Sequence, residues 1–222
     1  MMDATPAALV RPRLKAPRAA AIAGIMFSVL FIVGLVLVRL LVPADPLEDG
    51  RWLPHGGKIV SFALSLLPFA GIAFLWFMAV LRDRLGTYED RFFDTVFLGS
   101  GFLFLAMLFM CAALASGIIM IHGNASNRQL DAGIYTFGRS ITYQLMHIYA
   151  IKMAGVFMIL TSMLSLRTGI VPRWMAILGF VLAVLLLLSV GYFQWTPLLF
   201  PLWVLMISVY VLFFNLKVIT EN

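Results

Sequence analysis

Residues 20–42 decide the fold class, and they read AAIAGIMFSVLFIVGLVLVRLLV. The run contains one charged residue, Arg39. A helix of roughly 20 mostly apolar residues is long enough to cross the hydrocarbon core of a bilayer. Five further runs of the same character follow. Together they predict six membrane-spanning helices at about 20–42, 58–81, 94–121, 137–163, 174–193 and 197–216.

The overall composition excludes a soluble protein. Hydrophobic residues make up 63% of the chain and charged residues 12%, with a mean hydropathy of +1.02. Ordinary globular chains carry about 25% charged residues. The single cysteine, Cys111, excludes an internal disulfide framework. The sequence therefore predicts an all-α, polytopic transmembrane bundle whose first partner is the lipid bilayer.

The chain ends are short and polar. Residues 1–19 form a basic segment, and the apolar run behind it is longer than the 7–15 residues of a signal peptide. We therefore expect an uncleaved first span. Residues 20–216 form the transmembrane domain and residues 217–222 a short tail. Between the last two spans, Pro197 fits the first turn of a helix, so we expect a tight helical hairpin there.

The distribution of positive charge predicts the orientation. Ten Lys and Arg residues fall on the side of the N-terminus, three on the opposite side, and three within spans. Cytoplasmic loops carry the excess of Lys and Arg. We therefore expect a multi-pass protein of the inner membrane with both termini in the cytoplasm. Membrane topology accounts for the excess of basic over acidic residues, so nucleic acid is not an expected partner.

The span at 137–163 is unusually polar. At 100° per residue, Ser140, Tyr143, Gln144 and His147 fall within one arc of the helix. This stripe predicts either the wall of a cavity open to the outside or a set of hydrogen bonds that fixes the packing of neighbouring helices. We expect these four side chains to point into the bundle, because lipid cannot satisfy their hydrogen bonds.

Lys152 lies near the middle of the same span. A lysine at the centre of a helix costs on the order of 3 kcal/mol to insert. No Asp or Glu lies within any span to pair with it, and Asp94 is the nearest candidate. The alternatives are a backbone carbonyl, such as the one that Pro68 frees, a bound anion or loss of the proton. The helical phase separates Lys152 from His147.

Arg39 and Arg139 lie near the outer ends of their spans. Interfacial salt bridges are one interpretation of the two arginines. An anionic lipid headgroup or small anionic ligand at the outer mouth of the polar stripe is the other. Carboxylates that could pair with them lie in the outer loops at Asp45, Glu48, Asp49 and Asp131.

The sequence favours a protein without a metal, a cofactor or a catalytic centre. His55 and His122 lie in the outer loops and do not form a zinc-binding spacing. Ser100, between two glycines, is similar to the serine of intramembrane proteases. However, neither His122 nor His147 lies close enough to act as its base.

Two short motifs resemble the uncharacterised six-span bacterial membrane proteins catalogued as domains of unknown function. They are Arg18-Ala-Ala-Ala-Ile-Ala-Gly24 and Val171-Pro-Arg-Trp174, followed by Leu178-Gly179. The resemblance implies an inner-membrane location and no particular activity. We expect a protein that binds or transports a small or lipidic ligand in a cavity lined by the fourth span. The alternatives are an accessory or scaffold subunit that packs on a membrane partner or a second copy, and an intramembrane enzyme.

Overall fold

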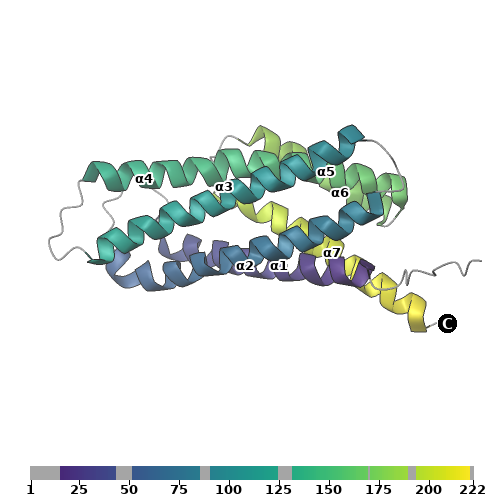
Figure 1. Cartoon of the computed structure of the whole chain (residues 1–222), viewed down its shortest axis with the longest axis horizontal. Helices are drawn as coiled ribbons and strands as arrows, with labels where there is room; N and C mark the ends of the chain where they lie inside the picture. Colours follow the sequence, from purple (N-terminus) through teal and green to yellow (C-terminus); the bar gives the residue numbers. More distant parts are fainter. Residues whose placement is uncertain are drawn as a thin grey trace, which may run out of the picture.

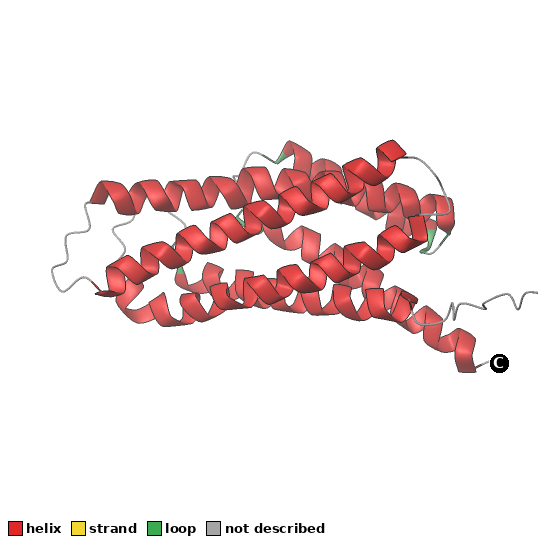
Figure 2. Ribbon diagram, in the orientation of Figure 1, coloured by secondary structure: helices red, strands yellow, loops and turns green. Residues whose placement is uncertain are grey.

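The computed structural model describes residues 16–43, 52–85, 91–124, 132–169, 171–189 and 194–220, and within these ranges it contains helices and no strands (Figure 2). The prediction of an all-helical fold is confirmed. The elements in chain order are α1 (Ala16–Leu41), α2 (Leu53–Leu85), α3 (Arg91–Asn124), α4 (Ala132–Gln144), the π-helix η1 (Leu145–Ala150), α5 (Ile151–Thr168), α6 (Arg173–Leu188), the 3-10 helix η2 (Thr196–Leu198) and α7 (Leu199–Thr220).

Five of the helical segments are long and apolar enough to cross a membrane. They are Ala19–Leu41, Leu53–Arg82, Phe92–Ile121, Gly133–Arg167 and Thr196–Phe213. The remaining apolar helix, α6, has 16 residues and is therefore about 24 Å long at 1.5 Å per residue. This is shorter than a hydrocarbon core of about 30 Å. The fold is thus that of a helical membrane protein in which one apolar helix is short.

The helices form an elongated bundle with two distinct ends (Figure 1). We call the end where α1 begins and α7 finishes the proximal end, and the end where α3 finishes and α4 begins the distal end. Helix α1 packs against α2 and α7, and α5 packs against α6. Helices α4, η1 and α5 follow one another as a single long rod, and α6 lies beside its α5 part (Figure 1).

The core of the bundle is a cluster of eight phenylalanine rings. Pairs within it include Phe27–Phe74 and Phe97–Phe157, with ring centroids 4.8 Å apart, and Phe104–Phe200 at 4.9 Å. Tilted and edge-to-face pairs of this kind are favourable arrangements for aromatic rings. The cluster joins five helices and consists of Phe27, Phe31, Phe74, Phe77, Phe97, Phe104, Phe157 and Phe200.

Two glycines allow helices to approach closely. A Cβ atom on Gly24 of α1 would overlap the hydroxyl of Ser208 on α7. A Cβ atom on Gly179 of α6 would overlap the Ser162 hydroxyl and lie 2.7 Å from Nε1 of Trp203, which is fully buried. Small residues at such crossings are typical of helix packing in membranes, where close van der Waals contact drives association.

Candidate ligand-binding cavity

The π-helix η1 changes which residues of the fourth span face the bundle. In an unbroken α-helix, the buried face at Ile151 would continue to residues 147, 144 and 140. A π-helical turn holds one extra residue, because its hydrogen bonds run from i to i+5. The face that is buried or lines the cavity towards the distal end runs through Met146, Thr142, Arg139 and Tyr135, with Tyr143 and His147 at its edge and Gln144 and Ser140 outside it. The inward face is therefore displaced by one residue from the predicted stripe.

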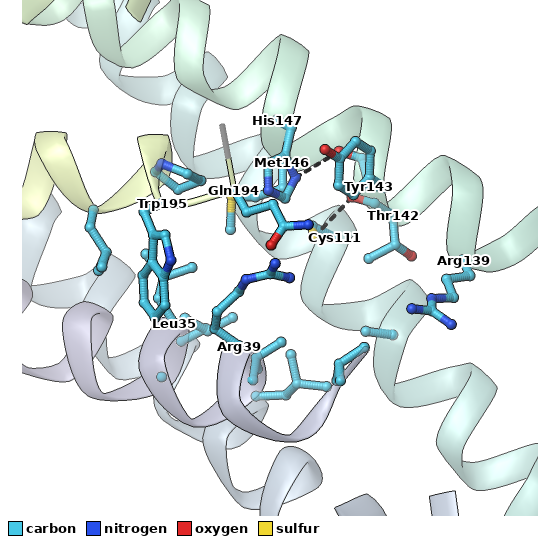
Figure 3. A pocket seen from close by; sticks show the side chains of 18 of the residues that line it. Leu35, Arg39, Cys111, Arg139, Thr142, Tyr143, Met146, His147, Gln194 and Trp195 are labelled. Atoms are coloured by element: carbon cyan, nitrogen blue, oxygen red, sulfur yellow. Dashed lines mark hydrogen bonds between the residues drawn. The ribbon is translucent and has the colours of Figure 1, made fainter. Parts of the chain in front are cut away.

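A cavity of about 160 Å³ lies on this displaced face. We call it the main cavity. It is enclosed by the distal half of α1, parts of α2 and α3, the α4–η1 rod, and the segment that leads into α7 (Figure 3). Most of its wall is apolar. The lining residues are Gly34, Leu35, Val38, Arg39, Val42, Pro43, Leu64, Leu67, Cys111, Ala115, Arg139, Thr142, Tyr143, Met146, His147, Gln194, Trp195, Pro197 and Leu198.

His147 and Tyr143 form one polar corner of the main cavity. Their rings are stacked, with centroids 4.0 Å apart and planes inclined by 12°. Nδ1 of His147 lies 3.2 Å from the backbone oxygen of Tyr143 (Figure 3). Because a carbonyl oxygen only accepts, we assign a proton to Nδ1.

Arg39 is the second polar element of the wall. Its side chain extends from α1 into the main cavity toward Gln194, with the Tyr143–His147 pair beyond (Figure 3). Within the described ranges, Arg39 makes no hydrogen bond and no ion pair. The loop carboxylates expected as its partners, Asp45, Glu48, Asp49 and Asp131, lie outside the described residues.

Arg139 has a different role from Arg39, although it lines the same cavity. Its Nη2 donates to the backbone oxygen of Pro43, and its Nη1 donates to Tyr135 Oη at 3.4 Å. Trp52 Nε1 donates to the same Tyr135 oxygen at 2.9 Å. These bonds tie α4 to the end of α1 and to the start of α2. Arg139 is thus held by protein partners at the distal rim.

A second cavity adjoins the main cavity beneath these bonds. It measures about 90 Å³, and its wall includes Trp52, Ile118 and Tyr135. We call it the side cavity. Arg139 and Thr142 line both cavities and stand between them. Toward the proximal end, the space narrows to a void of about 10 Å³ against Phe31, Phe104 and Phe200 of the aromatic cluster.

Three of the predicted site residues do not line the main cavity. Gln144 is exposed on the perimeter of the bundle, so the expectation that it points inward is wrong. Ser140 is half-buried and lines neither cavity. Both corrections follow from the extra residue in the π-helical turn, which turns these two side chains away from the cavity.

Lys152 is the third of these residues, and it caps a helix. Its Nζ donates to the backbone oxygen of Leu187 at 2.7 Å and to that of Ser189 at 3.4 Å. The last four carbonyls of a helix lack partners within the helix, and its C-terminus attracts cations. The alternative that paired Lys152 with Asp94 is wrong, because Arg82 binds both oxygens of Asp94 at 3.0 and 3.1 Å.

This capping explains why α6 is shorter than its apolar sequence predicts. The predicted span extended to residue 193, but α6 ends at Leu188 and Ser189 is extended, with a ψ of 131°. The Ser189 hydroxyl donates to the Leu186 oxygen at 2.9 Å. Three consecutive carbonyls from Leu185 to Leu187 therefore have partners at the point where the helix stops. The predicted end of this span at residue 193 is wrong, because α6 ends at Leu188, and Gln194 and Trp195 before η2 line the main cavity.

Sequence analysis missed several lining residues. Gln194 and Trp195 lie in the predicted hairpin connection, and Thr142 and Met146 are not among the residues of the predicted polar stripe. No signal in the sequence identifies the π-helical turn. The polar pair Gln194-Trp195 next to Pro197, inside an apolar region, was the only available hint of an irregular segment. In the described part of the chain, no three His, Cys, Asp or Glu side chains form a potential metal site.

The fold and its cavity define a class: an all-helical membrane protein with an internal, mostly apolar cavity and a few convergent polar groups. Comparison with protein-family models, curated proteins and solved structures gives no match. The function must therefore be argued from the cavity itself.

Proposed function

We propose that the chain is a six-span protein of a bacterial inner membrane, with its proximal end in the cytoplasm. Two observations support this orientation. Helix α1 begins and α7 finishes at the same end of the bundle (Figure 1), and ten Lys and Arg residues belong to that side. The non-helical residues Ser189, Gln194 and Trp195 are compatible with a membrane-spanning bundle, because irregular backbone at membrane depth is tolerated where it lines a cavity.

Cysteine labelling tests the orientation. With Cys111 replaced by serine, single cysteines at Asp49 and Asn127 are expected to react with an impermeant maleimide in intact cells. A cysteine at Arg173, at the proximal start of α6, is expected to react only after lysis. Protection at both loop positions, with labelling only in lysed cells, would show the opposite orientation.

The function that the geometry supports best is binding of a small or lipidic ligand in the main cavity. Ligand sites are typically concave and mostly apolar, with a few placed polar groups. The cavity has this composition, and its 160 Å³ is close to the volume of about 150 Å³ that holds a benzene molecule in an engineered protein cavity. The aromatic cluster closes its proximal side, so transport would require a second conformation in which these rings separate.

Filling the cavity tests this proposal. Ala115 lines both cavities, whereas Ala113 on the same helix is exposed. Ala115→Phe is expected to reduce the amount of lipid or small molecule that stays bound through purification by at least about tenfold, equivalent to 1.4 kcal/mol. Ala113→Phe is the matched control and should retain it. The measurement is native mass spectrometry, and equal adducts in both variants would contradict the proposal.

One observation favours a second function, that of an accessory or scaffold subunit. Gln144 exposes an amide on the perimeter, at a depth where the surrounding helix surface is apolar. Amide side chains commonly form hydrogen bonds between helices in membranes. The particle mass in detergent discriminates between the two functions. A complex that dissociates when Gln144 becomes leucine supports the scaffold, and a monomer with bound ligand supports the cavity.

A further inference from the structure

The main cavity contains a positive charge without a described counter-charge. Arg39 lines it, and the other arginine, Arg139, is already bonded to Pro43 and Tyr135. No carboxylate lines the cavity within the described residues, where Asp94 is held by Arg82 at the proximal end. Arg39 is half-buried in the wall of the cavity, and its guanidinium N–H groups have no described acceptor. They are therefore the groups of this cavity that can bind an anion.

The groups near Arg39 suit an acceptor-rich ligand. The guanidinium presents several N–H donors in a planar fork that matches carboxylate and phosphate oxygens. Gln194 turns its amide oxygen toward Arg39, and its amide nitrogen is a further donor on the side of Tyr143 and His147 (Figure 3). The hydroxyl of Thr142 already donates to the oxygen of Gly138 at 2.8 Å, so it is not one of the donors that would bind the head group.

The remainder of the cavity suits an apolar chain. Arg39 lies near the distal end of α1, and Gly34 is five residues, or about 7.5 Å, farther toward the bilayer centre. Leu67 and Met146 line the same wall, and the aromatic cluster closes the space beyond. A ligand with its charged end at Arg39 and its chain directed toward the aromatic cluster would match this gradient from polar rim to apolar floor.

The cavity volume limits the ligand to one chain. The 160 Å³ of the main cavity encloses a group of about benzene size, and the adjoining side cavity adds about 90 Å³ of mostly apolar space. The two cavities together therefore accommodate part of one acyl chain and not two chains side by side.

We propose that the main cavity selects a single-chain amphiphile with an anionic head, and that Arg39 is the residue that binds this head. The inference rests on the proposed ligand-binding function and adds the chemical class of the ligand. A fatty-acid carboxylate and a lysolipid phosphate have the same head chemistry, namely an anionic oxygen pair on one acyl chain.

The test compares three probes on the full-length protein in a non-ionic detergent. Oleic acid carries a carboxylate, lysophosphatidylglycerol a phosphate, and monooleoylglycerol a neutral head. Binding is measured by native mass spectrometry and by the shift in melting temperature. We expect at least one anionic probe to bind about tenfold more tightly than the neutral one, as the loss of one charged hydrogen bond implies. Preference for one of the two anionic probes identifies the source of the head.

Variants at Arg39 decide the role of its charge. Arg39→Gln is expected to lower the affinity for the anionic probe by about tenfold, to the level of the neutral one. Arg39→Lys, which keeps the charge but loses the fork, should give an intermediate value. Lys58→Gln removes an exposed cation near the same end of the bundle and should leave binding unchanged. Circular dichroism and the gel-filtration profile check that each variant is folded.

The outcomes separate this inference from the proposed function. Equal binding of all three probes in the wild type, lost in Ala115→Phe, would leave the binding function standing and overturn the selection of anions. The selection of anions would also be overturned if Arg39→Gln left the affinity for the anionic probe unchanged. The same holds if Lys58→Gln lowered that affinity as much as Arg39→Gln does. Absence of binding of every probe would overturn the inference, and the binding function itself would be refuted only if the wild type and Ala115→Phe also retain equal adducts through purification.

Discussion

Gly179→Leu is expected to lower the stability of the bundle by about 3 kcal/mol, the upper part of the usual cost of overpacking. The reason is that Gly179 lies on the face of α6 that contacts α5 and α7. Its backbone faces the buried Ser162 hydroxyl and the indole of Trp203, and a Cβ atom alone would lie 2.8 Å from Cζ2 of that ring. Trp203 is fully buried, so a displaced indole would have to displace other side chains of the core. Helix α6 would therefore be displaced from its neighbours.

The melting temperature in detergent measures this effect, and Gly99→Leu is the matched control. No atom beyond its own helix lies within 4 Å of a Cβ placed on Gly99. Leucine there removes a helix-interior glycine, which disfavours a helix by about 1 kcal/mol relative to alanine. We expect the control to be neutral or stabilising. A Gly179→Leu protein as stable as the wild type would show that α6 is not packed as the structure describes.

Lys152→Met is expected to destabilise the bundle by about 2 kcal/mol, the cost of leaving a buried hydrogen-bonding group unsatisfied. Removal of a charge from hydrocarbon could have stabilised the protein instead. However, helices that have separated but remain inserted carry the same lysine at the same depth, so the insertion cost is common to both states. The bonds from Nζ to the Leu187 and Ser189 oxygens exist only in the assembled bundle.

Two measurements separate capping from a general effect on folding. Thermal unfolding gives the loss of stability, and hydrogen exchange should become faster at Leu187–Ser189 while the aromatic cluster stays protected. Lys152→Arg, which retains several donors, should recover most of the loss. Lys58→Met, at an exposed lysine of α2, should have no effect. Unchanged exchange at the end of α6 would show that Lys152 does not hold it.

The capped end of α6 also bears on how the cavity is built. Helix α6 stops within the bundle, and residues from Gln194 to Leu198 then contribute to the cavity wall. If α6 continued to residue 193, as its sequence predicts, the connection to α7 would leave the bundle at the distal surface. Helix α6 therefore ends where Lys152 binds the Leu187 and Ser189 oxygens, and Gln194 and Trp195 beyond this end line the main cavity.

Most of the architecture was predictable from the sequence. Each predicted span corresponds to a helix, because a chain in hydrocarbon must satisfy its backbone hydrogen bonds internally and an apolar run therefore becomes helical. One of the two interpretations of Arg39 and Arg139 placed them at the outer mouth of the stripe that contains Tyr143 and His147, and all four residues line the main cavity. These features depend on local composition and on which residues share a helix face.

Three features depended on contacts between residues distant in the chain. The partner of Lys152 lies 35 residues away on α6, so no local pattern indicates it. The end of α6 depends on this lysine from another helix, and its own apolar sequence continues beyond Leu188. The π-helical turn adds a residue that changes the face presented by η1 and α4, so that Gln144 points outward and Met146 and Thr142 point inward. Helix periodicity assumes a constant turn, and that assumption fails where packing against neighbouring helices selects a different one.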